Sequence, residues 1–215
     1  MITLYLVRHG ETTYNAEGRI QGHEDAPLSA LGRKQAEAIA KRLSGEKFTA
    51  VYSSDLGRAR VTAEIIAAPH NLAVKTTPLI RESNLGVLQG MTRAEVEERY
   101  PAELHEWRRN PLTMRPPGAE TREEVIARCV EFLQMVSEAH EDGDQILAVG
   151  HGGSLRGLIV ASCGLPAEFY RMIHLSNTSL SIVEIGESSA LWLLNDTCHL
   201  NSLVTYEEDV DNVAH

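Results

Sequence analysis

Three short segments combine arginine or histidine with glycine and small polar residues, directly after apolar runs typical of buried strands. They are RHG at 8–10 after ITLYLV (2–7), SSD at 53–55 leading to Arg58 after AVYSS (50–54), and GHGG at 150–153 at the end of DQILAVG (144–150). A packed core does not need charged side chains at these positions. The residue types therefore point to chemistry at the strand ends.

Two arginines, two histidines and glycine-bordered backbone amides together suit a phosphoryl group. Guanidinium forks match phosphoryl oxygens, and the glycines at 152 and 153 open a predicted helix whose first N–H groups favour an anion. Of His9 and His151, one could attack phosphorus while the other donates to the oxygens. The attacking imidazole must be neutral, and the charges of Arg8 and Arg58 favour that form by lowering its pKa.

A proton must also reach the leaving oxygen, and Glu82 is the candidate donor. It lies in LIRESNLG (79–86), just after the third predicted strand. A carboxyl group that faces a phosphate dianion favours its protonated form. From the residues alone, a surface ion pair of Glu82 with Arg81 or Arg93 explains it equally well.

The elements that must position these residues alternate between strand and helix, which predicts an α/β fold with a mostly parallel sheet. Strands are expected at 2–7, 50–54, 72–78, 144–150, 179–185 and 190–195, the last two pairing antiparallel; helices are expected at 29–43 (N-cap Ser29), 58–70, 121–140 and 153–163. In such a sheet the carboxyl ends of the strands share one edge, where ligands bind. The three segments should therefore meet there.

The alternation breaks between residues 84 and 120, which we interpret as a helical insertion over the cleft. A capping box, Thr92 with Glu95, starts one helix, and a second follows around 103–109. The Pro/Gly-rich stretch 110–120 is expected to be a loop that contacts substrate. The whole chain, 1–215, is predicted to form one domain.

The bulk properties limit the partners. The 215 residues carry a formal net charge of −10, which argues against binding to nucleic acid or to an anionic membrane. No apolar run is long enough to span a membrane, and the N-terminus lacks the pattern of a signal peptide. The three cysteines are widely spaced, which fits a reducing cytoplasm. The acidic stretch 207–212 is expected to be loosely ordered.

Four motifs in order resemble the histidine phosphatase (phosphoglycerate mutase-like) superfamily over nearly the whole chain. They are RHGET (8–12) continued by Asn15, GRIQG (18–22) and PLSALGRKQA (27–36); SSDLGRARVTAE (53–64); RESNLGVLQG (81–90); and VGHGGSLR (149–156). The resemblance implies a three-layer α/β/α sandwich around a mostly parallel six-stranded sheet with one antiparallel strand. It further implies no metal and no other cofactor.

The resemblance also assigns roles position by position. His9 would be the nucleophile that becomes phosphohistidine, and Glu82 the general acid and then the base. The remaining positions would bind the phosphoryl group or line its pocket: Arg8, Asn15, Arg58, His151, Gln21, Gly22 and the backbone near Gly152. The expected partner is a small phosphomonoester, which the sequence does not identify.

Four alternatives to a phosphatase can be compared with the sequence. A phosphoglycerate mutase would share the chemistry, but mutases of this superfamily typically carry a longer insertion and an arginine-rich segment after the acid, where this chain has SNLG (83–86). A metal site formed by His9, His151 and Glu82 is disfavoured by the adjacent arginines. HGGS (151–154) lacks the continuation of an esterase motif. A non-catalytic scaffold would be expected to have lost a catalytic residue.

The strand LWLLND (191–196) could also pair two subunits into a homodimer.

Overall fold

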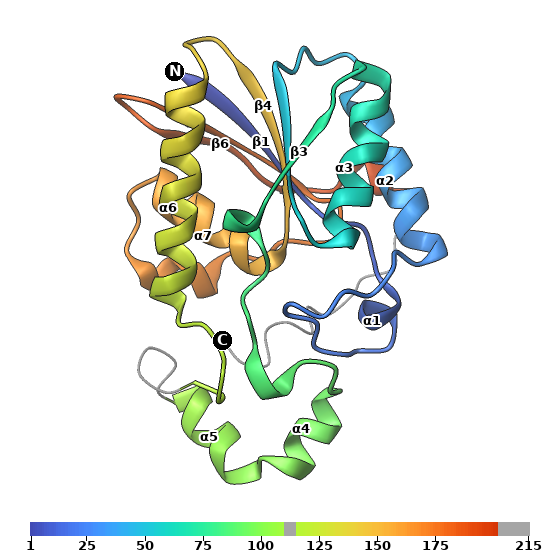
Figure 1. Cartoon of the computed structure of the whole chain (residues 1–215), viewed down its shortest axis with the longest axis vertical. Coiled ribbons are helices and arrows are strands. Elements are labelled where there is room, and N and C mark those ends of the chain that lie inside the picture. The colour runs from blue at the N-terminus through green and yellow to red at the C-terminus, as the bar shows by residue number, and fades with distance from the viewer. Residues whose placement is uncertain (110–114, 202–215) are drawn as a thin grey trace.

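A six-stranded sheet forms the centre of the protein, whose computed structural model describes residues 1–109 and 115–201 (Figure 1). The strands are β1 (Ile2–Arg8), β2 (Ala50–Ser54), β3 (Val74–Thr77), β4 (Gln145–Gly150), β5 (Leu180–Ile185) and β6 (Ala190–Asp196). Their order is β3-β2-β4-β1-β5-β6. The first four run parallel, and β5 is antiparallel to both of its neighbours. The predicted strand set and the single antiparallel strand are confirmed.

Helices cover both faces of the sheet, which gives the three-layer α/β/α sandwich (Figure 1). The layers are α2 (Ala30–Leu43) with α3 (Gly57–Ala67), and α6 (Arg122–Ala139) with α7 (Gly152–Ser162). Alternate residues of β1 serve the two sides: Leu4 and Leu6 pack in the core under α6 and α7, and Tyr5 and Val7 in the core under α2 and α3. Burial on both faces explains why this strand is a continuous apolar run.

Capping side chains set several helix starts where the sequence predicts them. Ser29 accepts a hydrogen bond from the N–H of Gly32 at the start of α2. The pair Thr121 and Glu124 forms the expected capping box of α6. The helix predicted over 58–70 was wrong at its end, because the α-helix stops at Ala67 and a 3₁₀ turn, Ala68–His70, follows. Pro69 has no N–H to continue the helical ladder.

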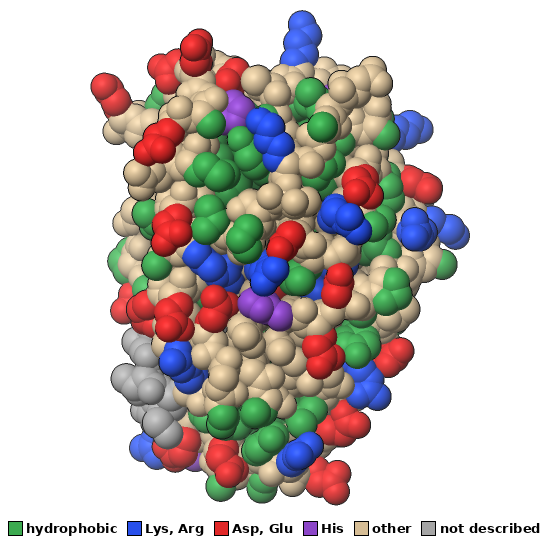
Figure 2. Space-filling view, viewed as in Figure 1, with side chains coloured by type: hydrophobic (Ala, Val, Ile, Leu, Met, Phe, Trp, Pro, Cys, Tyr) green, Lys and Arg blue, Asp and Glu red, His purple; other side chains and the backbone are tan. Residues whose placement is uncertain are grey.

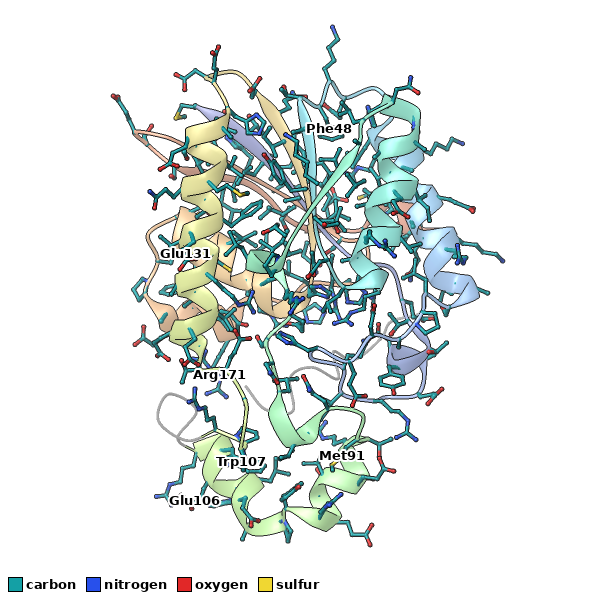
Figure 3. All side chains as sticks on the ribbon, in the orientation of Figure 1. Phe48, Met91, Glu106, Trp107, Glu131 and Arg171 are labelled. Carbon is teal, nitrogen blue, oxygen red and sulfur yellow. The ribbon has the colours of Figure 1, made fainter. Side chains whose placement is uncertain are left out.

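A small helical unit lies at the end of the molecule toward which the parallel strands point (Figure 1). It comprises α4 (Arg93–Arg99) and α5 (Pro101–Arg109), and the short α1 (Thr13–Ala16) lies nearby in the same view. Trp107 lies in this unit and Met91 directly before it, whereas Phe48 lies at the opposite end of the molecule (Figure 3). The unit confirms a helical insertion, and the limits 84–120 stay a prediction.

Short 3₁₀ turns complete the described chain. Those not yet named are Pro78–Ile80, Gly86–Leu88, Ala167–Met172 and Cys198–Leu200. The predicted tail 207–212 lies outside the described residues, as does part of the predicted 110–120 loop, while Thr92 caps α4 as expected.

One face of the surface, the helices and the cysteines bear on the expectations about partners and location. On the face shown in Figure 2, acidic and basic side chains are interspersed. None of the helices in the described part of the chain is long and apolar enough to cross a membrane. All three cysteines are free thiols.

Candidate active site

The carboxyl ends of β1 and β4 place the two motif histidines next to each other. These strands are parallel neighbours, with Arg8 in register with Gly150. The N–H of His9 donates to the carbonyl of Gly150 at 3.0 Å, which continues the ladder one residue past the strand. As a result, the ring centroids of His9 and His151 are 5.1 Å apart. The sheet therefore brings together the two histidines that the sequence separates by 142 positions.

His9 is buried and held in one tautomer. Its Nδ1 lies 2.7 Å from the carbonyl oxygen of Gly10. A carbonyl only accepts hydrogen bonds, so Nδ1 carries the proton and Nε2 keeps a lone pair. Burial, and then the positive charges of Arg58 and Arg8, lower the pKa of His9 well below its usual value. The ring is therefore neutral, with a nucleophilic nitrogen.

His151 is held in the opposite tautomer. Its Nδ1 accepts a hydrogen bond from Nε of Arg58 at 3.2 Å, which leaves the proton of the neutral ring on Nε2. Burial and the charge of Arg58 lower the pKa of His151 well below its usual value, so the neutral form dominates. In the described structure Nε2 is buried without a hydrogen-bond partner. A buried donor of this kind indicates a ligand or water that accepts from it.

The two arginines of the motifs are almost fully buried, at 1% exposure for Arg58 and 3% for Arg8. Arg58 lies in the first turn of α3 and donates to the carbonyls of Gly22 and Glu24, both at 2.7 Å. Arg8 donates to the carbonyl of Leu175 at 2.6 Å. Each guanidinium is thus anchored by backbone oxygens while its charge acts on the histidine pair.

Glu82 lies in the site, so the alternative of a surface ion pair is wrong. Its carboxylate accepts from the N–H of Gly153 at the start of α7, at 2.9 and 3.2 Å. The Oε2 atom of Glu82 and the guanidinium carbon of Arg8 both lie 3.8 Å from the position that a Cβ would take on Gly152.

The arginines offered as its surface partners are paired elsewhere. Arg81 binds Asp55 in a bidentate pair, and Arg93 lies 3.5 Å from Glu97.

The remaining predicted residues differ in how the structure connects them to the site. Asn15 uses its side-chain oxygen locally, as acceptor from the N–H and hydroxyl of Thr12. Gln21 is buried, and its Nε2 has no hydrogen-bond partner among the described residues, so it is available to a ligand. Gly22 presents its carbonyl to Arg58 and has a φ of +56°, a conformation that favours glycine. Contact of Asn15 with the phosphoryl group stays a prediction.

The sequence reasoning missed a supporting segment before β5. The side-chain amide of Asn177 donates to the carbonyl of His9 at 3.0 Å, and the N–H of Thr178 donates to the carbonyl of Arg8 at 3.1 Å. The cluster SNTS (176–179) was visible as turn chemistry before a strand. What the sequence did not contain was its location beside β1, which only the antiparallel pairing of β5 provides.

The site combines a neutral imidazole with a lone pair on Nε2, a second neutral imidazole that can donate from Nε2, two fixed cations and a carboxyl group. This set suits in-line displacement at a phosphoryl group, where the cations and the donor stabilise charge on the oxygens. The described residues contain no group of three or more His, Cys, Asp and Glu side chains that could hold a metal ion.

Comparison with known proteins agrees with this geometry. The profile of the histidine phosphatase superfamily (branch 1) matches residues 4–197. The chain belongs to the histidine phosphatase superfamily. The match spans all four motifs between residues 8 and 156.

Relatives within the superfamily include proteins named as phosphoglycerate mutases and proteins named as phosphatases. A protein of Yersinia pestis named "Probable phosphoglycerate mutase GpmB" is 38% identical, over 94% of this chain and 96% of the relative. Among solved structures, YhfR of Bacillus stearothermophilus has a TM-score of 0.86 at 32% identity, covering 94% of this chain and all of that one. A mycobacterial glucosyl-3-phosphoglycerate phosphatase in complex with VO3 has a TM-score of 0.83 at 30% identity, covering 91% and 99%. This member of the histidine phosphatase superfamily therefore resembles proteins named as mutase and as phosphatase.

Proposed function

We propose that this protein hydrolyses the phosphate monoester of a small metabolite through a phosphohistidine on His9. The observation that carries the proposal is the hydrogen bond from Nδ1 of His9 to the carbonyl of Gly10. It leaves Nε2 as the lone-pair nitrogen of a buried, neutral ring whose neighbours are cationic or hydrogen-bond donors. Such a nitrogen is a nucleophile for an anionic phosphoryl group.

In the first step, the lone pair of Nε2 forms a bond to phosphorus as the ester P–O bond breaks. The bonding pair leaves with the ester oxygen, which takes the proton of the Glu82 carboxyl group and departs as an alcohol. The Nδ1–H of His9 stays hydrogen-bonded to Gly10 and stabilises the positive charge that the ring acquires. Nε2–H of His151 donates to a phosphoryl oxygen, and Arg8 and Arg58 offset the negative charge.

In the second step, a water oxygen forms a bond to phosphorus as the N–P bond breaks. Glu82, now a carboxylate, takes the proton of the water. Inorganic phosphate leaves, His9 is neutral again and Glu82 is again protonated. Atoms and charges balance over the two displacements without a metal ion, so we expect full activity in EDTA.

We propose that water, rather than a second substrate molecule, accepts the phosphoryl group from His9. The arginines beside Glu82 are already bound by other groups of the protein and are not available to hold a second anionic substrate. Arg81 is paired with Asp55, and Arg128 donates to backbone carbonyls and to Glu120. A mutase must keep the dephosphorylated carboxylic acid bound while the phosphoryl group is attached to the histidine. Binding that carboxylate requires additional cationic side chains. The mutase remains the second candidate because of the name of the 38% identical relative.

One experiment tests both candidates. Wild-type protein is mixed with radiolabelled phosphoserine, a phosphorylated sugar or 3-phosphoglycerate, quenched within milliseconds, and analysed for acid-labile label on His9. We expect label on His9 and release of inorganic phosphate. Isomerisation of 3-phosphoglycerate that is faster than phosphate release would favour the mutase. Label on another residue would contradict the mechanism. Loss of turnover in EDTA would instead favour the alternative of a metal site formed by His9, His151 and Glu82.

Three further expectations accompany this proposal: a phosphomonoester as the partner, with no role for nucleic acid or a membrane; a cytoplasmic location; and a homodimer. The basis for the homodimer is the edge strand β6, where Trp192 is 67% exposed. Sedimentation of the intact protein measures the oligomeric state directly.

A further inference from the structure

The segment that carries Glu82 has few backbone hydrogen bonds of its own. Residues 81–84 lie in neither helix nor strand, between the 3₁₀ turn Pro78–Ile80 and the next turn. Glu82 is nevertheless only 3% exposed. Buried carbonyl groups outside regular structure need donors from elsewhere. Those donors determine where the carboxyl group of Glu82 lies.

One side chain on α6 supplies them. Arg128 donates from one terminal nitrogen to the carbonyls of Leu79 and Arg81, at 2.9 and 2.7 Å. Its other terminal nitrogen donates to the carbonyl of Glu82 at 3.0 Å. Three carbonyls of one short segment thus accept from a single guanidinium group, including the carbonyl of the proposed general acid itself.

Arg128 is fixed in turn by a carboxylate. Its Nε and one terminal nitrogen donate to the two oxygens of Glu120, at 3.0 and 3.1 Å. Together with the three carbonyls, these contacts provide an acceptor for each of the five N–H donors of the guanidinium group. The Arg128 side chain is 15% exposed, so little of this network is open to water. A lysine, with three donors and no planar fork, could not reproduce it.

Glu120 and His23 extend the network around Glu82. Glu120 accepts from the N–H of Asn84 at 2.7 Å and donates its own N–H to the carbonyl of Asn84 at 2.9 Å. Nε2 of His23 lies 2.8 Å from the carbonyl of Glu82, as a second donor to it. The segment is therefore held on both sides of Glu82, and Arg128 is the group that joins it to α6.

We propose that Arg128 is the positioning residue of Glu82: its three hydrogen bonds to backbone carbonyls, together with its pair with Glu120, hold the 79–84 segment so that the carboxyl group meets the leaving oxygen. The inference rests on the proposed function, since it gives Glu82 the role of general acid. Arg128 touches backbone and Glu120 rather than the reacting atoms. Its loss should therefore impair proton transfer to the leaving group and spare the attack by His9.

The leaving group separates these two effects. The measured quantity is the single-turnover rate of phosphohistidine formation, with phosphoserine and with p-nitrophenyl phosphate. An alkoxide needs a proton to leave, whereas p-nitrophenolate is stable without one, so only the first substrate requires the acid. For Arg128→Met we expect a loss of about 100-fold with phosphoserine and of less than about 5-fold with p-nitrophenyl phosphate. Arg128→Lys should behave in the same way.

Two controls separate positioning from general destabilisation and from failure of the proposed function. Arg42→Met removes a comparable bidentate pair, with Asp196, and should leave both rates unchanged. Glu82→Gln should reproduce the leaving-group effect. Equal losses on both substrates in Glu82→Gln would overturn its acid role. The expected effect in Glu82→Gln but equal losses, or none, in Arg128→Met would overturn the positioning role alone.

A smaller change covers the case in which Arg128→Met does not fold. Glu120→Gln keeps the size of the side chain and the carbonyl contacts of Arg128, but removes the charge of its partner. We expect a loss of about 3- to 10-fold that is confined to phosphoserine, with a melting temperature close to wild type. If folded Glu120→Gln and Arg128→Lys lose the same factor in rate on both substrates, or lose none, relative to wild type, the inference is overturned.

Discussion

The strand-end site and the helical unit of α4 and α5 lie at the same end of the sheet, but different interactions hold them. His9 is tied to the ladder through the carbonyl of Gly150, and its neighbours donate to backbone carbonyls. The helical unit instead packs around a separate apolar cluster: Ile20, Leu85, Leu88, Val96, Leu104 and Trp107. The chemistry is thus built into the main core, whereas the unit above it has a small core of its own. Damage to one should be separable from damage to the other.

The largest effect is expected from removing His9, the proposed nucleophile. His9→Asn should lower turnover by at least about 10⁴-fold, equivalent to ~5.5 kcal/mol of barrier, because the covalent route is lost. His105→Asn is the matched control, since this histidine is exposed on α5 and should retain wild-type turnover. Steady-state hydrolysis of a phosphomonoester measures both. Substantial activity in His9→Asn would contradict the assignment of the site.

The next effect tests the independence of the helical unit. Trp107→Ala removes a side chain that is 5% exposed and should cost ~3–5 kcal/mol of local stability, seen as faster hydrogen exchange in α4 and α5. Phosphohistidine formation from p-nitrophenyl phosphate should persist. Phe48→Ala is the matched change in the main core, where Phe48 stacks edge-on with Tyr5, and should lower the global unfolding free energy. If Trp107→Ala instead stops phosphorylation, the two regions are not separable.

A third, smaller effect concerns the contact between Glu82 and the start of α7. A Cβ on Gly153 would overlap Oε1 of Glu82 and Oγ of Ser83, so Gly153→Ala should displace the carboxyl group and cost ~1–3 kcal/mol of stability. Gly45→Ala has no atom within 4 Å of the added Cβ and serves as the control. Urea unfolding and single-turnover rates measure the two consequences. Wild-type rates in Gly153→Ala would show that Glu82 does not need this position.

A change of about one pH unit has a comparably small effect on stability for each histidine. Burial and the arginine charges lower the folded-state pKa of His9 and His151 below the unfolded value near 6.5, so only the unfolded chain gains these protons as pH falls below that value. Each histidine should therefore cost ~1.4 kcal/mol of stability per pH unit below pH 6.5, until its folded pKa is reached. Urea unfolding between pH 7 and pH 5 measures the slope. His9→Asn should reduce it, and an unchanged slope would contradict a neutral His9.

Local patterns in the sequence were sufficient for most elements. The apolar run 2–7 predicted β1, and the capping box of Thr121 and Glu124 predicted the start of α6, because both signals act within a few residues. The end predicted for α3 was wrong. The helix was predicted to continue to residue 70, but Pro69 has no N–H to extend the α-helical hydrogen bonds. The motif arginines and histidines were predicted together because all four lie at or soon after the carboxyl ends of parallel strands of one sheet.

The sequence by itself determined the superfamily of this protein: residue types at strand ends, in the order of the histidine phosphatase motifs, identify the histidines and arginines of the site, with His9 as the proposed nucleophile. Tertiary structure decided the rest. Whether Glu82 lies in the site or on the surface depended on α7 and on the three carbonyls that Arg128 binds from α6. Such contacts join positions dozens of residues apart, and no local spacing encodes them. The tautomers of His9 and His151 likewise follow from hydrogen bonds that exist only in the folded chain.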